Sequence, residues 1–289
     1  MRIEVNGVKL EYQDSGGDKT AFVTLHGGPG MSSHAGDWGA FQPLTDSFRL
    51  IAYDHRGCGA SEGREPYSHE QFVADLEALR QQLGLGKMVL LGGSYGGYIA
   101  LKYALRHQEN LHALILRDTA ASNKYRDTSR QKALASGFPM DQDRLERLFA
   151  GRMTSNEDFR DSFAMILPLY DYHRDPEAEA QRLAAIPFRY ETHNWAFSRN
   201  QPNFDLTEKL LSIKVPALIT VGRHDWVTPL EASEELFSLL PNSELVVFEE
   251  SGHAPHIEEN QRYLGALRDF LARRAPKALK VPRSKAAFG

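Results

Sequence analysis

Residues 88–97 read MVLLGGSYGG, and this stretch decides how the rest of the sequence is interpreted. The apolar residues at its start predict a buried strand, and the apolar run that follows Gly97 predicts a helix. Between them, GGSYG matches the pattern G-x-S-x-G, in which a serine lies on a strained turn between a strand and a helix. Glycine is needed two residues before and after Ser94 because a Cβ at either position would clash with neighbouring backbone. The stretch therefore predicts that Ser94 is a nucleophile.

The same alternation of apolar strands and helical patterns extends along most of the chain. Six short apolar runs, each followed by a turn, lie at residues 22–25, 48–53, 88–91, 113–116, 217–221 and 245–248. Runs that are apolar without interruption are typical of parallel strands that are covered on both faces by helices. The sequence therefore predicts an α/β fold with a mostly parallel central sheet.

One interval breaks this alternation. Residues 121–205 contain no convincing strand pattern, and helical patterns with acidic starts dominate them. We therefore expect a helical cap at 121–205, inserted into a discontinuous core formed by residues 1–120 and 206–274. Residues 275–289 carry four basic side chains and no acidic one, and we expect them to form a disordered tail.

Composition excludes several classes of function. The formal net charge is -4, so no basic surface for nucleic acid is expected over the chain as a whole. No apolar run approaches the ~18 residues that cross a membrane, and the N-terminus lacks the apolar centre of a signal peptide. Cys58 is the single cysteine, which suits a reducing compartment. We expect a cytoplasmic protein that binds a small molecule, and the oligomeric state is left open.

A serine nucleophile needs a base, and the base needs an acid that orients it. In this architecture the acid and then the histidine follow the serine along the chain. Asp225 ends the turn GRHD after one predicted strand, and His253 ends the turn SGH after the next. Both turns lie at carboxyl ends of parallel strands, where open α/β sheets bind their ligands. We predict a Ser94–His253–Asp225 triad, with Asp118 as the alternative acid.

A second glycine-rich loop, HGGPG at residues 26–30, follows the first predicted strand. Consecutive glycines leave backbone N–H groups accessible to a ligand. We predict that the backbone amides of Gly28 and Tyr95 form an oxyanion hole. The pattern H-x-x-H at 253–256 contains a proline and has no evident third ligand, so no metal site is predicted and no cofactor is required.

Together these motifs resemble the α/β-hydrolase fold and, more narrowly, the proline iminopeptidase group. The resemblance rests on HGGPG (26–30), DHRGCGAS (54–61), GGSYGG (92–97), GRHD (222–225) and SGH (251–253). It implies a serine hydrolase that forms an acyl-enzyme and releases an N-terminal residue, often proline, from small peptides or amides. It also implies carboxylates, from or near the cap, that hold the free amine of the substrate. In some relatives a glutamate follows the catalytic aspartate, whereas this sequence has Trp226.

Three functions follow from these patterns. Glu191 is the candidate carboxylate for an amine in an iminopeptidase-like enzyme. The aromatic residues of the cap, with Trp195 and Trp226 as candidate substrate contacts, suit the apolar pocket of a carboxylesterase or lactonase equally well. A non-catalytic receptor is the third possibility, but it would not require a complete triad.

Overall fold

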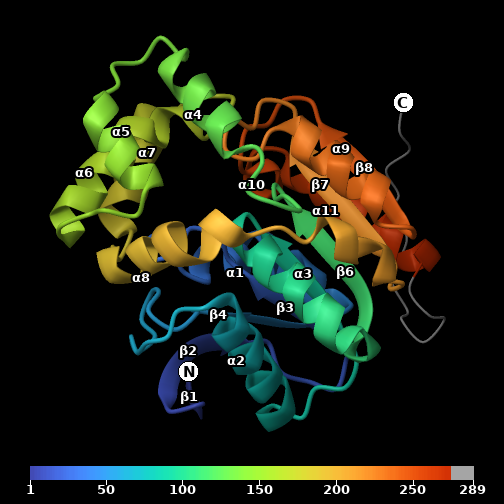
Figure 1. Cartoon of the computed structure of the whole chain (residues 1–289). Coiled ribbons are helices and arrows are strands. Elements are labelled where there is room, and N and C mark those ends of the chain that lie inside the picture. The colour runs from blue at the N-terminus through green and yellow to red at the C-terminus, as the bar shows by residue number, and fades with distance from the viewer. Residues whose placement is uncertain (275–289) are drawn as a thin grey trace.

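The computed structural model describes residues 1–274, and an eight-stranded sheet runs through its centre (Figure 1). The strands lie side by side in the order β1-β2-β4-β3-β5-β6-β7-β8. β2 is antiparallel to both β1 and β4, and all other neighbours are parallel. The strands are β1 (Arg2–Val5), β2 (Val8–Asp14), β3 (Ala21–Leu25), β4 (Arg49–Tyr53), β5 (Met88–Gly93), β6 (Leu111–Arg117), β7 (Ala217–Gly222) and β8 (Ser243–Phe248). The predicted α/β class is confirmed.

The six predicted strands correspond to β3 to β8, but the sequence analysis missed the hairpin that β1 and β2 form. Its turn is Asn6-Gly7, and both residues have positive φ angles, 46° and 74°. An Asn-Gly pair between alternating apolar residues is a strong local signal for such a hairpin. The alternating residues are Ile3, Val5, Val8 and Leu10.

Helices cover both faces of the sheet, as Figure 1 shows. Met88 and Leu90 of β5 belong to one apolar cluster together with side chains of α2, α3 and α9, whereas Val89 and Leu91 belong to a second cluster with side chains of α1 and α11. Because both faces are buried, the strand reads as one continuous apolar run. These helices are α1 (Ala35–Phe41), α2 (His69–Gln82), α3 (Tyr95–His107), α9 (Leu230–Leu239) and α11 (Asn260–Arg274), and the short α10 (Pro255–Glu258) precedes the last of them.

The chain between β6 and β7 forms a helical insertion. Its helices are α4 (Arg126–Leu134), α5 (Gln142–Phe149), α6 (Asn156–Ile166), α7 (Pro176–Ala185) and α8 (Tyr190–Trp195). They have an apolar cluster of their own, which also includes Met31 and Trp226. Because Met31 follows β3 and Trp226 follows β7, the insertion packs over the carboxyl ends of these strands. The predicted tail, 275–289, lies outside the described residues.

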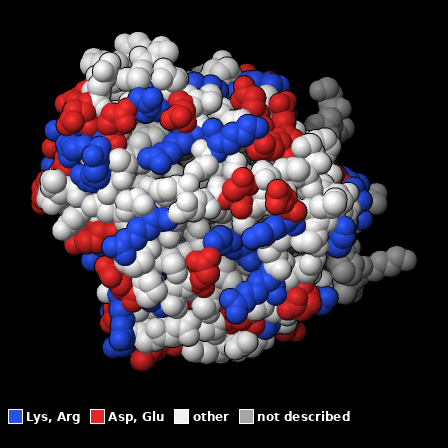
Figure 2. Space-filling model, in the orientation of Figure 1, with Lys and Arg blue, Asp and Glu red and all other residues white. Residues whose placement is uncertain are grey.

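Basic and acidic side chains are interspersed over the face of the molecule that Figure 2 shows. Within residues 1–274, no helix combines the length and the apolar character that crossing a membrane requires. The cytoplasmic location and the absence of a nucleic-acid partner stay predictions.

Candidate active site

Ser94 lies on a sharp turn between β5 and α3. Its φ of 51° and ψ of -120° are rare for a residue with a side chain. A Cβ on Gly92 would contact the carbonyl group of Gly96 and the Cβ of Ala100, and a Cβ on Gly96 would contact the carbonyl oxygen of His26 at 2.7 Å. These positions therefore accept only glycine, for the steric reason that the sequence analysis gave.

His253 and Asp225 are joined by a buried hydrogen bond. The Nδ1–H of His253 donates to Oδ2 of Asp225 at 2.8 Å, and their side chains are 9% and 0% exposed. The Asp225 carboxylate is held from the other side as well. Its Oδ1 accepts from the backbone amides of Val227 and Thr228 at 2.7 and 3.1 Å, and Oδ2 accepts from Oγ1 of Thr228 at 2.8 Å. The carboxylate thus has a fixed orientation toward the imidazole ring.

The environment of His253 favours its charged form. Burial opposes protonation, but the charge of Asp225 and the hydrogen bond that His253 donates to it outweigh burial and raise the pKa of the imidazole above its ordinary value. A histidine that acts as a general base becomes an imidazolium when it removes a proton from a hydroxyl group. A neighbouring carboxylate favours this step because it stabilises the imidazolium.

Asp118, the alternative acid, lies beside this pair but does not bond to the histidine. One ligand atom from each of Asp118, Asp225 and His253 lies within 4.8 Å of the others. Oδ1 of Asp118 accepts from the Gly222 amide at 3.0 Å, and within residues 1–274 its buried Oδ2 has no hydrogen-bond partner. Burial, together with the neighbouring charge of Asp225, raises the pKa of Asp118 to about 8. A hydrogen bond joins Asp225 to His253, and the Gly222 amide holds Asp118 beside them.

A cavity of about 440 Å³ brings most of the predicted site residues together. Ser94, His253, Gly28 and Tyr95 all line it, and the helical insertion supplies many of the other lining residues. This volume lies within the range of small-molecule binding sites. Tyr95 is the first residue of α3, so its N–H group has no acceptor inside the helix, and Gly28 has a positive φ of 54°. The two residues whose backbone amides are predicted to form the oxyanion hole thus line the same cavity as Ser94.

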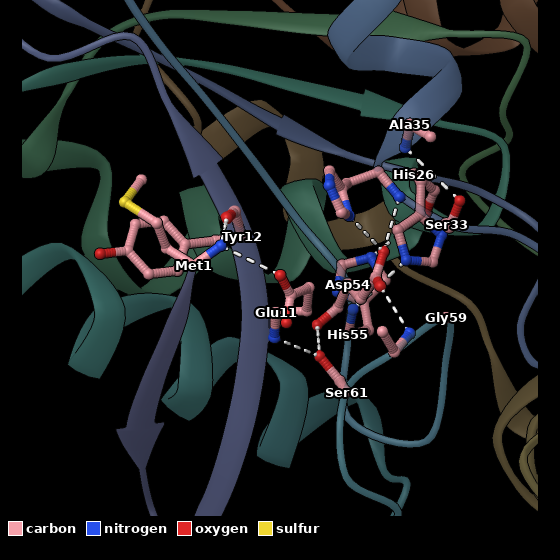
Figure 3. A network of polar contacts seen from close by, with 12 residues as sticks. Met1, Glu11, Tyr12, His26, Ser33, Ala35, Asp54, His55, Gly59 and Ser61 are labelled. Carbon is pink, nitrogen blue, oxygen red and sulfur yellow. Dashed lines mark hydrogen bonds and ion pairs between the residues drawn. The ribbon is translucent and has the colours of Figure 1, made fainter.

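The loop that carries Gly28 is tied to the turn after β4 by a buried network around Asp54 (Figure 3). Oδ1 of Asp54 accepts from the backbone amide and the Nδ1 of His34, both at 2.7 Å, and Oδ2 accepts from the Ala60 amide at 2.7 Å. The His55 amide donates to Nε2 of His26 at 3.2 Å. The segments that contain the motifs HGGPG and DHRGCGAS are therefore held together by hydrogen bonds.

Only one of the three predicted substrate contacts lies at the cavity. Trp226 lines the cavity, but Glu191 and Trp195 do not. Glu191 is exposed on α8, and Trp195 packs against Tyr67. Successive residues of a helix point in directions about 100° apart, so only one face of α8 can turn toward the cavity. Sequence spacing alone could not show which face that is.

Several lining residues were missed by the sequence analysis. The backbone carbonyl oxygen of Tyr170 accepts from the His253 amide at 2.7 Å. The Tyr170 ring stands edge-on to the imidazole, with 5.5 Å between the ring centroids. Arg117, Asp37 and Arg126 also line the cavity. No local motif marks these residues, because they come from different parts of the chain and meet only when it folds.

The geometry can be compared with known proteins. A family model described as the alpha/beta hydrolase fold matches residues 20–260. The chain belongs to this family. It is 32% identical to the proline iminopeptidase PfmaB of Pestalotiopsis fici over 93% of this chain and 98% of that protein. It is 31% identical to a proline iminopeptidase of Heyndrickxia coagulans, over 93% of this chain and 97% of that one.

Among solved structures, an esterase from Exiguobacterium antarcticum superimposes with a TM-score of 0.76 at 28% identity. The match covers 93% of this chain and 97% of the esterase. The predicted fold and the resemblance to proline iminopeptidases are thereby confirmed, and the protein is a hydrolase.

Proposed function

We propose that the protein hydrolyses small esters or amides by acyl transfer through Ser94, with His253 as the base and Asp225 as the orienting acid. The observation that carries this proposal is the buried 2.8 Å hydrogen bond between His253 and Asp225, at the wall of a cavity that Ser94 also lines. Asp225, not Asp118, holds the imidazole. The arrangement fits the Ser-His-Asp template, in which the carboxylate fixes the tautomer of the base.

The proposed reaction has two halves. His253 takes the proton of the Ser94 hydroxyl as its oxygen attacks the substrate carbonyl, and the amides of Gly28 and Tyr95 stabilise the negative charge on the carbonyl oxygen. His253 then gives that proton to the leaving alcohol or amine, which leaves an ester bond between the acyl group and Ser94. A water molecule repeats the sequence, releases the carboxylic acid and restores the serine.

We further propose that residues 121–205 act as a cap over a core of residues 1–120 and 206–274. Helices of the insertion supply one side of the cavity, and strand ends of the core supply the other. A cap of this kind limits access of water and sets the shape of the acyl pocket.

The charges around the cavity favour an ester over a substrate with a free amine. Asp37 is the single carboxylate among the lining residues in the described part of the chain, and it is already paired with Arg117 at 2.9 Å. An ammonium group would therefore find only a carboxylate whose charge Arg117 already neutralises, and the exposed Glu191 does not supply another. The geometry best supports a carboxylesterase or lactonase. Release of an N-terminal residue is the second candidate, which the names of the curated relatives favour.

A paired kinetic assay tests both the mechanism and the substrate. Hydrolysis of p-nitrophenyl butyrate is compared with hydrolysis of prolyl- and alanyl-p-nitroanilide and of their N-acetylated forms. Ser94→Ala is the test variant, and Ser238→Ala, on the exposed face of α9, is the matched control. We expect ester turnover that Ser94→Ala abolishes and Ser238→Ala preserves.

Each outcome of this assay has a defined meaning. Anilide turnover that is lost on acetylation, without ester turnover, would favour the aminopeptidase over the esterase. Full activity of the Ser94→Ala variant would refute the proposed nucleophile for either substrate.

A further inference from the structure

Three arginines line the cavity, and two of them are neutralised by carboxylates. Nη1 of Arg117 lies 2.9 Å from Oδ1 of Asp37, and Nη2 of Arg182 lies 2.8 Å from Oδ2 of Asp171. Burial opposes the charge of Arg117, but Asp37 outweighs burial and raises the pKa of the guanidinium. Arg126, the third arginine, has a different environment.

Arg126 is half-buried at the start of α4, and in residues 1–274 it forms no ion pair. Its Nη2 donates to the backbone carbonyl oxygen of Phe149. Burial is the largest influence on this guanidinium and lowers its pKa, although the charges of the nearby carboxylates Asp127 and Glu146 act in the opposite direction. A partly buried charge without a counter-ion is unfavourable, so a ligand of opposite charge would be stabilised next to it. Within residues 1–274, Arg126 thus brings to the cavity wall a positive charge that no carboxylate contacts directly.

Trp226, which also lines the cavity, has a donor without an acceptor among the described residues. The Nε1–H of Trp226 is buried and has no hydrogen-bond partner in the described chain. Phe149 connects the two residues, since its carbonyl accepts from Arg126 and its ring centroid lies 6.4 Å from that of Trp226. Ser129, one turn along α4, donates to the carbonyl oxygen of Val227 at 2.6 Å. Arg126 and Trp226 therefore belong to one wall of the cavity.

This wall adjoins the proposed catalytic residues. Trp226 directly follows Asp225 in the chain, and the ring of Tyr170 stands edge-on to Trp226 at 5.8 Å and to His253 at 5.5 Å. A substrate whose carbonyl lies at Ser94 can thus place another part of the same small molecule against this wall.

We propose that Arg126 and the indole N–H of Trp226 bind a carboxylate of the substrate. A guanidinium and a neutral N–H donor match the acceptor oxygens of a carboxylate, and neither group could bind an ammonium. This inference rests on the proposed function of Ser94 and adds that the substrate carries a negative charge. The carboxylate belongs either to the acyl part, as in a monoester of a dicarboxylic acid, or to the leaving part, as in the second residue of a dipeptide.

Two substrate pairs separate these sources, and in each pair the second member has an uncharged group in place of the carboxylate. The first is mono-p-nitrophenyl adipate and its methyl ester, and the second is prolyl-glycine and prolyl-glycinamide. For each pair the ratio of kcat/KM, charged over neutral, is measured for the native protein, Arg126→Gln and Trp226→Phe. Lys132→Gln is the matched control, because it removes one positive charge from an exposed position of the same helix.

We expect the native protein to prefer the charged member of one pair by at least roughly tenfold. Loss of a hydrogen bond to a charged group predicts that Arg126→Gln lowers this ratio by roughly 10- to 100-fold. Trp226→Phe keeps an aromatic ring but loses the donor, and should lower the ratio by a few-fold. Lys132→Gln should leave it unchanged. If Arg126→Gln does not fold, Trp226→Phe carries the test.

The inference is overturned if the native protein shows no preference for the charged member of either pair. It is also overturned if Arg126→Gln and Lys132→Gln change the ratio equally. An active Ser94→Ala variant would instead refute the proposed function. An inactive Ser94→Ala variant, together with an unchanged ratio in Arg126→Gln, would refute the anion site alone.

Discussion

Asp225→Asn replaces a single atom of the carboxylate that holds the His253 ring. Oδ1 of Asp225 accepts from two backbone amides, so the amide oxygen of the asparagine will take that place. Its NH₂ group then faces His253 Nδ1, where the native carboxylate accepts at 2.8 Å. To accept from this NH₂ group, Nδ1 must give up its proton, and the imidazole then carries it on Nε2. A ring in this tautomer cannot take the proton of Ser94.

The size of the effect follows from this change of tautomer. The same substitution in the Ser-His-Asp template lowers kcat on the order of 10⁴-fold. At ~1.4 kcal/mol for each tenfold change, this corresponds to about 5 kcal/mol in activation free energy. The loss of the Asp225 charge also removes the influence that raises the pKa of His253, so any residual activity should begin at lower pH than in the native protein.

The assay is kcat as a function of pH on whichever substrate the native protein turns over, with circular dichroism as a check of folding. Asp205→Asn is the matched control, because Asp205 accepts from the amide and Oγ1 of Thr207 at 2.9 and 2.7 Å in a similar turn at the surface. A folded Asp225→Asn variant with kcat within about tenfold of native would refute the tautomer argument. If Asp118→Asn were inactive instead, Asp118 would be the orienting acid.

Three further predictions concern the elements around the site. Gly96→Ala places a Cβ against the carbonyl oxygens of Leu25 and His26, which belong to the backbone and cannot move aside. We expect a loss of about 1–3 kcal/mol and a lower Tm in thermal unfolding, whereas Gly39→Ala, with open space around it, should not be destabilising. Asp118 has a pKa of about 8 in the fold against an ordinary 3.8, so its contribution to stability is present below about pH 4 and is lost as pH rises toward 8. Asp118→Asn cannot ionise, and urea unfolding should show its stability rising relative to native between pH 5 and pH 8; parallel pH profiles would contradict this assignment. Burial raises the pKa of Cys58 to about 12, so a thiol reagent such as Ellman's reagent should label the protein only after denaturation, and rapid labelling of the folded state would contradict the buried position.

Much of the fold could be predicted from local sequence. The strands β3 to β8 are continuous apolar runs because both of their faces are buried, and this property is visible without any knowledge of neighbours. The Ser94 turn was predictable for a related reason, because its flanking glycines are required by steric contacts with the neighbouring backbone. The hairpin of β1 and β2 carried an equally local signal in Asn6-Gly7, which the sequence analysis did not use.

The substrate-facing residues were not predictable in this way. Glu191 was chosen from sequence as the residue that would meet an amine, yet it is exposed, whereas Arg126 and Asp37 line the cavity. Which side chains of a helix face a cavity depends on how the helix packs. Neighbouring residues of a helix point about 100° apart, so one can line the cavity while the next faces solvent.

The sequence by itself determined the α/β class, the serine turn and the order in which the candidate acid and base follow it, because each depends on contacts within a few residues. Only the tertiary structure decided that Asp225, and not Asp118, bonds to His253, since both carboxylates follow a strand of the same sheet and the choice is made by a 2.8 Å contact between distant segments. The charge of the cavity was also decided by the tertiary structure. It depends on which arginines find a carboxylate partner, and the Arg117–Asp37 pair joins residues 80 positions apart.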